Sequence, residues 1–294
     1  MKTHYRKIPL LFLLVTPCCT PTSSTGTSQG ASFVSPSQTD FATAAESGTG
    51  MAMGGGGSTG TQTSTHSVFY GKGQDLLANP IQLQGYLLPA ADASSTKGII
   101  AIPGRLGLTK AFEENLAFFA QNGYSVLAVN LFNQIPVSLS DGTAMERELA
   151  SQGIPTILAN IEQGRAFLIQ RFQLAQVSVV GWDTGGRWAV ITALTAAGHY
   201  VAAASYAGDI TATLQQFSAT NISIPIFGVF SVEDTSISAS AIATLGGALQ
   251  SQNVPFTFQL VGGVQGNFMD PTSPTYDATQ SMAMLQKTLT LFPK

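Results

Sequence analysis

The turn at residues 181–186 (GWDTGG) carries the residues best suited to chemistry in this sequence. It follows the apolar run VSVVG, which reads as a buried strand, and it opens a segment of helical character. A Gly-x-nucleophile-x-Gly pattern between a strand and a helix is typical of a nucleophile elbow, in which glycines permit a tight turn and close helix packing. The central residue here is Asp183, which is neither a serine nor a cysteine.

An elbow serine or cysteine needs a base to remove its proton, and histidine is the usual base. The chain has three histidines, His4, His66 and His199. His4 lies in the basic start of the chain, and His66 lies at the edge of a polar stretch. His199 falls between a predicted helix and the start of a predicted strand, so we expect it on the face opposite the elbow. The sequence therefore argues against histidine-assisted chemistry.

Two other chemistries remain open for Asp183. It is itself the nucleophile, as in haloalkane dehalogenases and epoxide hydrolases, although those enzymes complete the reaction with a histidine-activated water. Alternatively it pairs with Asp234, and mutual repulsion raises one pKa to give an acid and a base. A hard-cation site from Asp183, Asp234 and Asp270 lacks a loop motif, so we expect no metal and no cofactor.

The elements that position these residues follow from the alternation of apolar runs with segments of helical period. The expected strands span 82–89, 98–102, 125–130, 177–181, 201–206, 225–230 and 256–261, and the expected helices 111–122, 157–172, 184–197 and 276–292. This order predicts an α/β fold with a mostly parallel central sheet and helices on both faces, formed by one domain at 67–294. In such sheets ligands bind at the carboxyl ends of the strands, where the elbow lies.

Several stretches together resemble the dienelactone hydrolase family of the α/β-hydrolase superfamily. They keep the family's order and spacing: GYL at 85–87, GIIAI at 98–102, QNGY at 121–124, VSVVGWDTGGRWAV at 177–190, PIFGVF at 225–230 and YDA at 276–278. The resemblance implies an ester- or lactone-hydrolase lineage with a triad of Cys or Ser, Asp and His. By position, Asp183 stands at the nucleophile, Asp234 at the acid and Gly266 at the histidine, so the triad is degraded. Gly104 stands where the family has another acidic residue.

Two functions follow from this resemblance. One is a hydrolase of the family's lineage, and the other is a catalytically silent ligand-binding or interaction protein on the same scaffold. We expect no hydrolysis of simple esters, because two triad positions depart from the pattern. For a small ligand, ester-like or other, we expect contacts from Thr184, Arg105, Trp182 and Phe268. An anionic Asp183 would favour a cationic or hydroxyl-bearing ligand and disfavour an oxyanion.

The composition narrows the classes of partner. Charged residues make up 10% of the chain and the net charge is −3, with lysines and arginines scattered beyond the N-terminus. Nucleic-acid binding needs a clustered basic face, so we expect no nucleic-acid partner. The only cysteines, Cys18 and Cys19, lie near the N-terminus, so the folded part has neither a disulfide framework nor a thiolate metal site.

The N-terminus predicts export. Residues 1–19 combine a basic start with an apolar run at 8–15, which is too short to cross a bilayer core of about 30 Å. A cysteine after such a run resembles a bacterial lipoprotein signal, which would lipidate Cys18 or Cys19. Plain secretion and a retained hydrophobic segment are the alternatives. Residues 20–66 are rich in Ser, Thr and Gly and predict a disordered linker. We expect either a lipoprotein of the bacterial cell envelope or a secreted protein.

Overall fold

The computed structural model describes residues 66–74, 79–132, 147, 149–196, 198–208 and 224–292. The predicted signal at 1–19 and all but the last residue of the predicted linker at 20–66 lie outside the described residues. Within the described ranges, no helix combines the length and the apolar character needed to cross a membrane.

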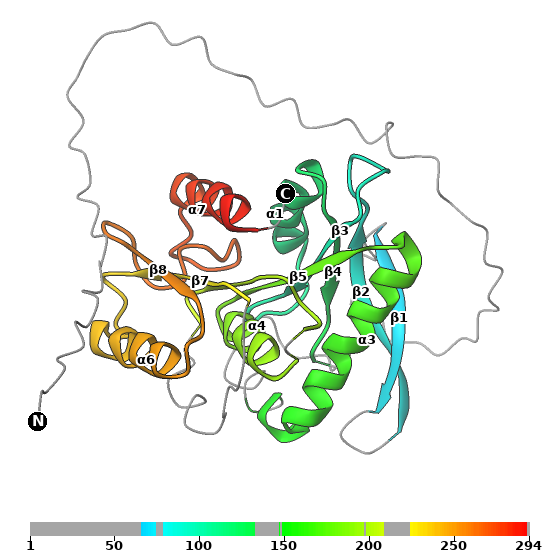
Figure 1. Cartoon of the computed structure of the whole chain (residues 1–294), viewed down its shortest axis with the longest axis horizontal. Helices are drawn as coiled ribbons and strands as arrows, with labels where there is room; N and C mark the ends of the chain where they lie inside the picture. Colours follow the sequence, from blue (N-terminus) through cyan, green and yellow to red (C-terminus); the bar gives the residue numbers. More distant parts are fainter. Residues whose placement is uncertain are drawn as a thin grey trace, which may run out of the picture. The chain divides into compact units, whose positions relative to one another are not determined.

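The core of the molecule is an eight-stranded sheet with the order β1-β2-β4-β3-β5-β6-β7-β8 (Figure 1). β1 pairs antiparallel with β2 and β2 with β4, whereas every other neighbouring pair is parallel. The prediction of a mostly parallel sheet is therefore confirmed. The strands are β1 (Ser67–Gln74), β2 (Pro80–Leu88), β3 (Lys97–Ile102), β4 (Ser125–Val129), β5 (Gln176–Trp182), β6 (Ala203–Tyr206), β7 (Ile226–Ser231) and β8 (Phe256–Val261).

Helices cover both faces of the sheet, as predicted. The apolar sides of α1 and α7 pack in one core cluster, and those of α3, α4 and α6 pack in a second cluster on the other face (Figure 1). The helices are α1 (Lys110–Gln121), α3 (Ile154–Phe172), α4 (Thr184–Thr195), α6 (Ala239–Ser251) and α7 (Ala278–Leu291). Because helices lie on both sides, the central strands bury both of their faces.

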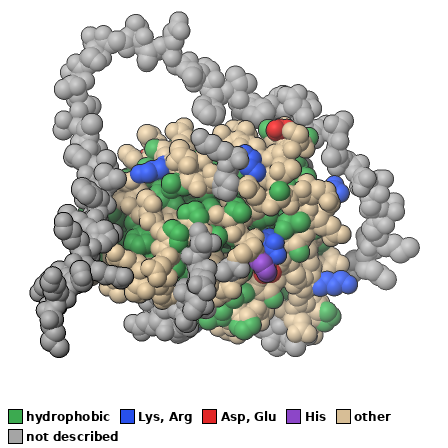
Figure 2. Space-filling view, in the orientation of Figure 1, with side chains coloured by type: hydrophobic (Ala, Val, Ile, Leu, Met, Phe, Trp, Pro, Cys, Tyr) green, Lys and Arg blue, Asp and Glu red, His purple; other side chains and the backbone are tan. Residues whose placement is uncertain are grey.

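Two elements were not predicted. β1 mixes polar and glycine residues at the sheet edge, and its Phe69 is exposed, so it lacks the apolar run of a buried strand. α6 consists largely of Ala, Ser, Thr and Gly, and only a few apolar side chains, such as Ile242 and Leu245, face the sheet. The surface also carries few charges, and on the face in Figure 2 the Lys and Arg side chains are scattered.

Close packing of α4 against the sheet forms the elbow. A Cβ atom at Gly181 would lie 2.0 Å from the carbonyl oxygen of Gly185, so this turn admits no side chain there. Asp183 has φ 51° and ψ −123°, a conformation that residues other than glycine rarely adopt. The turn thus places the Asp183 side chain at the carboxyl end of β5, at a cost in backbone strain.

We expect Gly185→Ala to lower the free energy of unfolding by about 3 kcal/mol, because the added methyl group overlaps backbone atoms that cannot rotate away. Its Cβ would lie 2.2 Å from the oxygen of Ile102 and 2.4 Å from that of Pro103. The control is Gly247→Ala in α6, where nothing lies within 4 Å. The control is expected to be neutral or to stabilise the helix by up to about 1 kcal/mol. Urea unfolding measures both variants, and equal stabilities would contradict the packing described.

Candidate active site

Hydrogen bonds of the Asp183 backbone fix the position of this residue. Its N–H donates to the carbonyl oxygen of Tyr206 in β6 (2.8 Å), and its own carbonyl accepts from the N–H of Gly186 (2.9 Å). The residue is only 6% exposed, so a charged carboxylate here must find protein partners.

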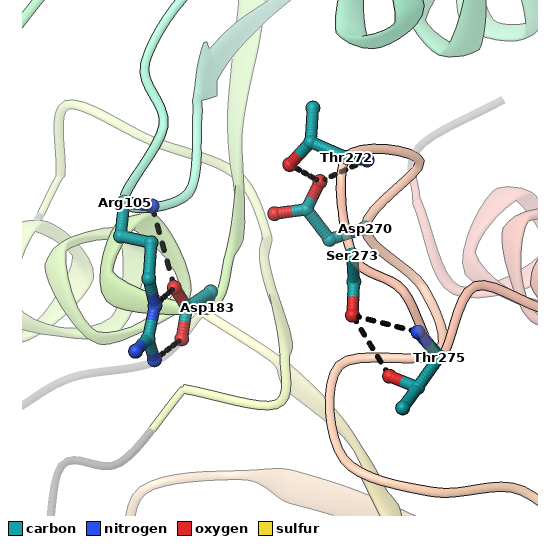
Figure 3. Close-up of polar contacts among 6 residues, drawn as sticks. All are labelled: Arg105, Asp183, Asp270, Thr272, Ser273 and Thr275. Atoms are coloured by element: carbon teal, nitrogen blue, oxygen red, sulfur yellow. Dashed lines mark hydrogen bonds and ion pairs between the residues drawn. The ribbon is translucent and has the colours of Figure 1, made fainter. Parts of the chain in front are cut away.

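Arg105 supplies those partners. Its Nε donates to Oδ2 of Asp183 at 2.6 Å and its Nη2 to Oδ1 at 2.7 Å, a two-pronged, charge-assisted pair (Figure 3). The backbone N–H of Arg105 also donates to Oδ2, at 3.3 Å. Arg105 lies in the loop between β3 and α1, and in α/β-hydrolases an N–H from this loop forms part of the oxyanion hole. The carboxylate of Asp183 therefore takes up a donor from the region that binds an oxyanion in active relatives of this fold.

The pKa of Asp183 lies below the ordinary value of an aspartate. Burial alone would raise this pKa, but the hydrogen bonds and the charge of Arg105, together with a hydrogen bond from the Asn267 side chain, outweigh it. Asp183 is consequently an anion at neutral pH. Because both of its oxygens are engaged by a cation, it is a weakened nucleophile and a weakened base.

A second buried carboxylate, Asp270, lies beside the elbow. Its Oδ1 accepts from the N–H (2.8 Å) and the hydroxyl (2.6 Å) of Thr272, and the residue is 5% exposed (Figure 3). A Cβ atom at Gly104 would lie 2.4 Å from Oδ2 of Asp270 and 3.2 Å from Cβ of Asp183. The two carboxylates therefore flank the same glycine.

The pKa of Asp270 is raised, in contrast to that of Asp183. Burial is the main cause and the charge of Asp183 adds to it, while the Thr272 hydrogen bonds and the charge of Arg105 oppose the rise without cancelling it. Sequence reasoning considered Asp270 only as a metal ligand. No run or spacing links it to Asp183, because the two residues meet only through the fold. Among the described residues, no group of three or more His, Cys, Asp and Glu side chains is placed to hold a metal ion.

The expected pairing of Asp183 with Asp234 is corrected by the structure. Asp234 follows β7, and its Oδ1 accepts from the N–H (2.7 Å) and hydroxyl (2.6 Å) of Ser236 and from the N–H of Ile237 (3.1 Å). Its Oδ2 is buried and accepts no hydrogen bond within the described part of the chain. The charge of Asp183 acts on Asp270, and Asp234 is not among the groups that shift the pKa of Asp183.

Gly266 and the two described histidines lie in different parts of the fold. Gly266 has φ 49°, and the nearest atom to a Cβ built there is Oγ1 of Thr275, at 3.7 Å. His199 follows the C-terminal end of α4, away from the elbow, and its Nδ1 lies 2.8 Å from Oε2 of Glu162 in α3. His66 hydrogen-bonds with Glu113 in α1, so it is part of the folded domain. Neither of these two imidazoles is at the elbow, and His4 lies outside the described residues.

The other residues predicted to contact a ligand differ in their exposure to solvent. Trp182 and Phe268 are both 0% exposed, which corrects the expectation that they wall an open pocket. The Trp182 ring packs against Phe112 and Tyr206, with centroid distances of 5.0 and 4.9 Å, so its role is in the core. Thr184 begins α4 and is partly exposed beside the elbow, so its contact with a ligand stays a prediction.

We expect Arg105→Gln to destabilise the fold by about 1–3 kcal/mol at neutral pH, because it leaves Asp183 buried without a counter-charge. The value is below that of a fully buried pair because the Arg105 side chain is 45% exposed and screened by solvent. In the wild type the pKa of Asp183 is lowered, so the ion pair stabilises the fold above the unfolded-state pKa and is lost as pH falls through the lowered pKa. In the variant, burial raises that pKa, so the deficit is largest at neutral pH and shrinks towards about pH 3.

Urea unfolding at both pH values measures this difference. Adding Asp183→Asn to Arg105→Gln removes the unpaired charge, and we expect it to restore part of the stability. Arg171→Gln, at the exposed end of α3, is the control for loss of a surface arginine. A deficit that is equal at both pH values, or one that the second substitution deepens, would argue against the ion pair.

Comparisons with known proteins agree with this geometry. The model of the dienelactone hydrolase family matches residues 83–294. A dienelactone hydrolase-like promiscuous phosphotriesterase from metagenomic libraries superposes with a TM-score of 0.61 at 16% identity, over 78% of this chain and 100% of that chain. Dienelactone hydrolase from Anabaena variabilis gives 0.55 at 14% identity, over 77% and 97% of the two chains.

Est1E from Butyrivibrio proteoclasticus gives a TM-score of 0.52 at 12% identity, over 72% of this chain and 95% of that chain. No curated protein matches the sequence. At such identities the likeness to solved structures shows the α/β-hydrolase fold alone. The family match spans most of the sequence, and it shows that this chain belongs to the dienelactone hydrolase family.

Proposed function

We propose that this member of the dienelactone hydrolase family does not hydrolyse simple esters and that it binds a small molecule at the elbow. The observation that carries the proposal is the engagement of both Asp183 oxygens by Arg105, at 2.6 and 2.7 Å. A carboxylate held in this way is an internal counter-ion. The family's triad needs instead a nucleophile that can be deprotonated and a base beside it.

Nucleophilic attack by Asp183 would use an oxygen that already accepts a charge-assisted hydrogen bond from Arg105, an interaction worth about 1.5–3 kcal/mol that lowers the reactivity of that oxygen. The resulting ester would then need an activated water, and neither described histidine is near the elbow. Attack by another group meets a further obstacle, because the Asp183 carboxylate already accepts the N–H of Arg105 and repels a developing oxyanion. These three points together favour binding over ester hydrolysis.

We expect no turnover of activated short-chain esters or lactones above buffer by the purified protein. The assay compares the wild type with Asp183→Asn and Asp270→Asn, and an active esterase serves as the positive control. Turnover that is lost in Asp183→Asn would refute the proposal and establish an aspartate nucleophile. Turnover that also needs Asp270 would refute it in favour of acid–base catalysis by the two buried carboxylates.

We also propose that the protein is exported and anchored by a lipid on Cys18 or Cys19, which the basic start and the short apolar run support. Metabolic labelling with an alkyne fatty acid in a bacterial host tests this. Label is expected on the wild type, and it should be absent from a variant with both Cys18→Ala and Cys19→Ala. Recovery of unlabelled wild-type protein from the medium would contradict the lipid anchor and indicate plain secretion.

A further inference from the structure

We propose that the elbow site binds a small protonated amine, and that Asp270 is the counter-ion for its ammonium group. This inference rests on the proposed binding function and adds the chemical class of the ligand. It follows from the geometry of Asp270, from the charge balance around Gly104, and from the way the other acceptors at the elbow are already used.

The carboxylate of Asp270 is fixed on one side and unsatisfied on the other. Thr272 occupies Oδ1 with two hydrogen bonds, and the Asp270 backbone is tied to Asn267 (3.0 Å) and Ser273 (2.9 Å). No described residue donates a hydrogen bond to Oδ2, although Asp270 is only 5% exposed to solvent. Figure 3 shows this second oxygen on the side where Arg105 and Asp183 lie. The protein therefore presents a rigid acceptor to the elbow.

The charges at the elbow do not balance. Two carboxyl groups, Asp183 and Asp270, lie near one guanidinium, and Nε and Nη2 of Arg105 both donate to Asp183. These two residues are the charged groups that act on Asp270. A buried carboxylate without a partner is costly, and either a proton or a cation can remove that cost. One monovalent cation would neutralise the site.

An ammonium group fits these conditions better than other ligand groups. It carries a single positive charge and donates N–H bonds to an acceptor such as Oδ2. A divalent metal would add two positive charges where one is needed, and the oxygens of Asp183 are already engaged by Arg105. An anion would meet the repulsion of two carboxylates. A neutral alcohol would satisfy Oδ2 but leave the charge unbalanced.

Titration calorimetry of the purified full chain with n-propylammonium, propionate and n-propanol tests the proposal, because the three probes share a chain length and differ in charge. We expect measurable binding of n-propylammonium only. Asp270→Asn should weaken that binding about 10- to 100-fold, the loss of one charge-assisted interaction, since it keeps the shape of the side chain and removes its charge. Asp92→Asn removes an exposed carboxylate in the turn before β3, at the opposite end of that strand, and should leave the affinity unchanged.

The wild type provides a second measurement that does not depend on how the variant folds. Because Asp270 must be ionised to bind an ammonium group and its pKa is raised, the affinity for n-propylammonium should fall as the solution is acidified through that pKa. Absence of n-propylammonium binding, equal affinity in Asp270→Asn, or stronger binding of propionate would overturn the proposal. The ester assay tests the absence of hydrolysis and calorimetry tests amine binding, so failure of one proposal can be distinguished from failure of the other.

Discussion

The ion pair between Arg105 and Asp183 permits a charged residue at the sharpest turn of the sheet. An aspartate at this position is buried, and in isolation it would be protonated or would unfold the turn. The guanidinium compensates the charge with two short hydrogen bonds, and the N–H of the same residue adds a third. The loop between β3 and α1 is thereby tied to the start of α4. The geometry of the elbow therefore depends on this pair.

The same pair changes what the inherited architecture can do. The sheet order, the tight glycine turn and the left-handed backbone of Asp183 form the frame that presents a nucleophile in this fold. Here that frame presents a carboxylate that is turned towards an internal cation. The charge left over belongs to Asp270, in a protein with few charged residues overall. The elbow therefore holds two buried carboxyl groups and one guanidinium, and no described residue donates a hydrogen bond to the second oxygen of Asp270.

Much of the fold could be predicted from the sequence, because strands buried on both faces appear as continuous apolar runs. β4 and β7 bury every residue and fall within one residue of the expected ranges. β1 and α6 carry no such pattern, since an edge strand and a helix rich in small residues need few large apolar side chains. At the site, the elbow and the missing histidine could be predicted from local motifs. The contact of Asp183 with Arg105 and the nearness of Asp270 could not, because these residues lie in loops that only the fold brings together.

The absence of a side chain at residue 104 leaves the space that the Asp270 carboxyl group fills. The carboxylate of Asp270 occupies the volume that a side chain at residue 104 would enter, with a separation of 2.4 Å from the first atom of such a side chain. Any side chain at residue 104 would therefore have to displace the Asp270 carboxyl group from its present position, so the placement of this buried group depends on a glycine in a different loop.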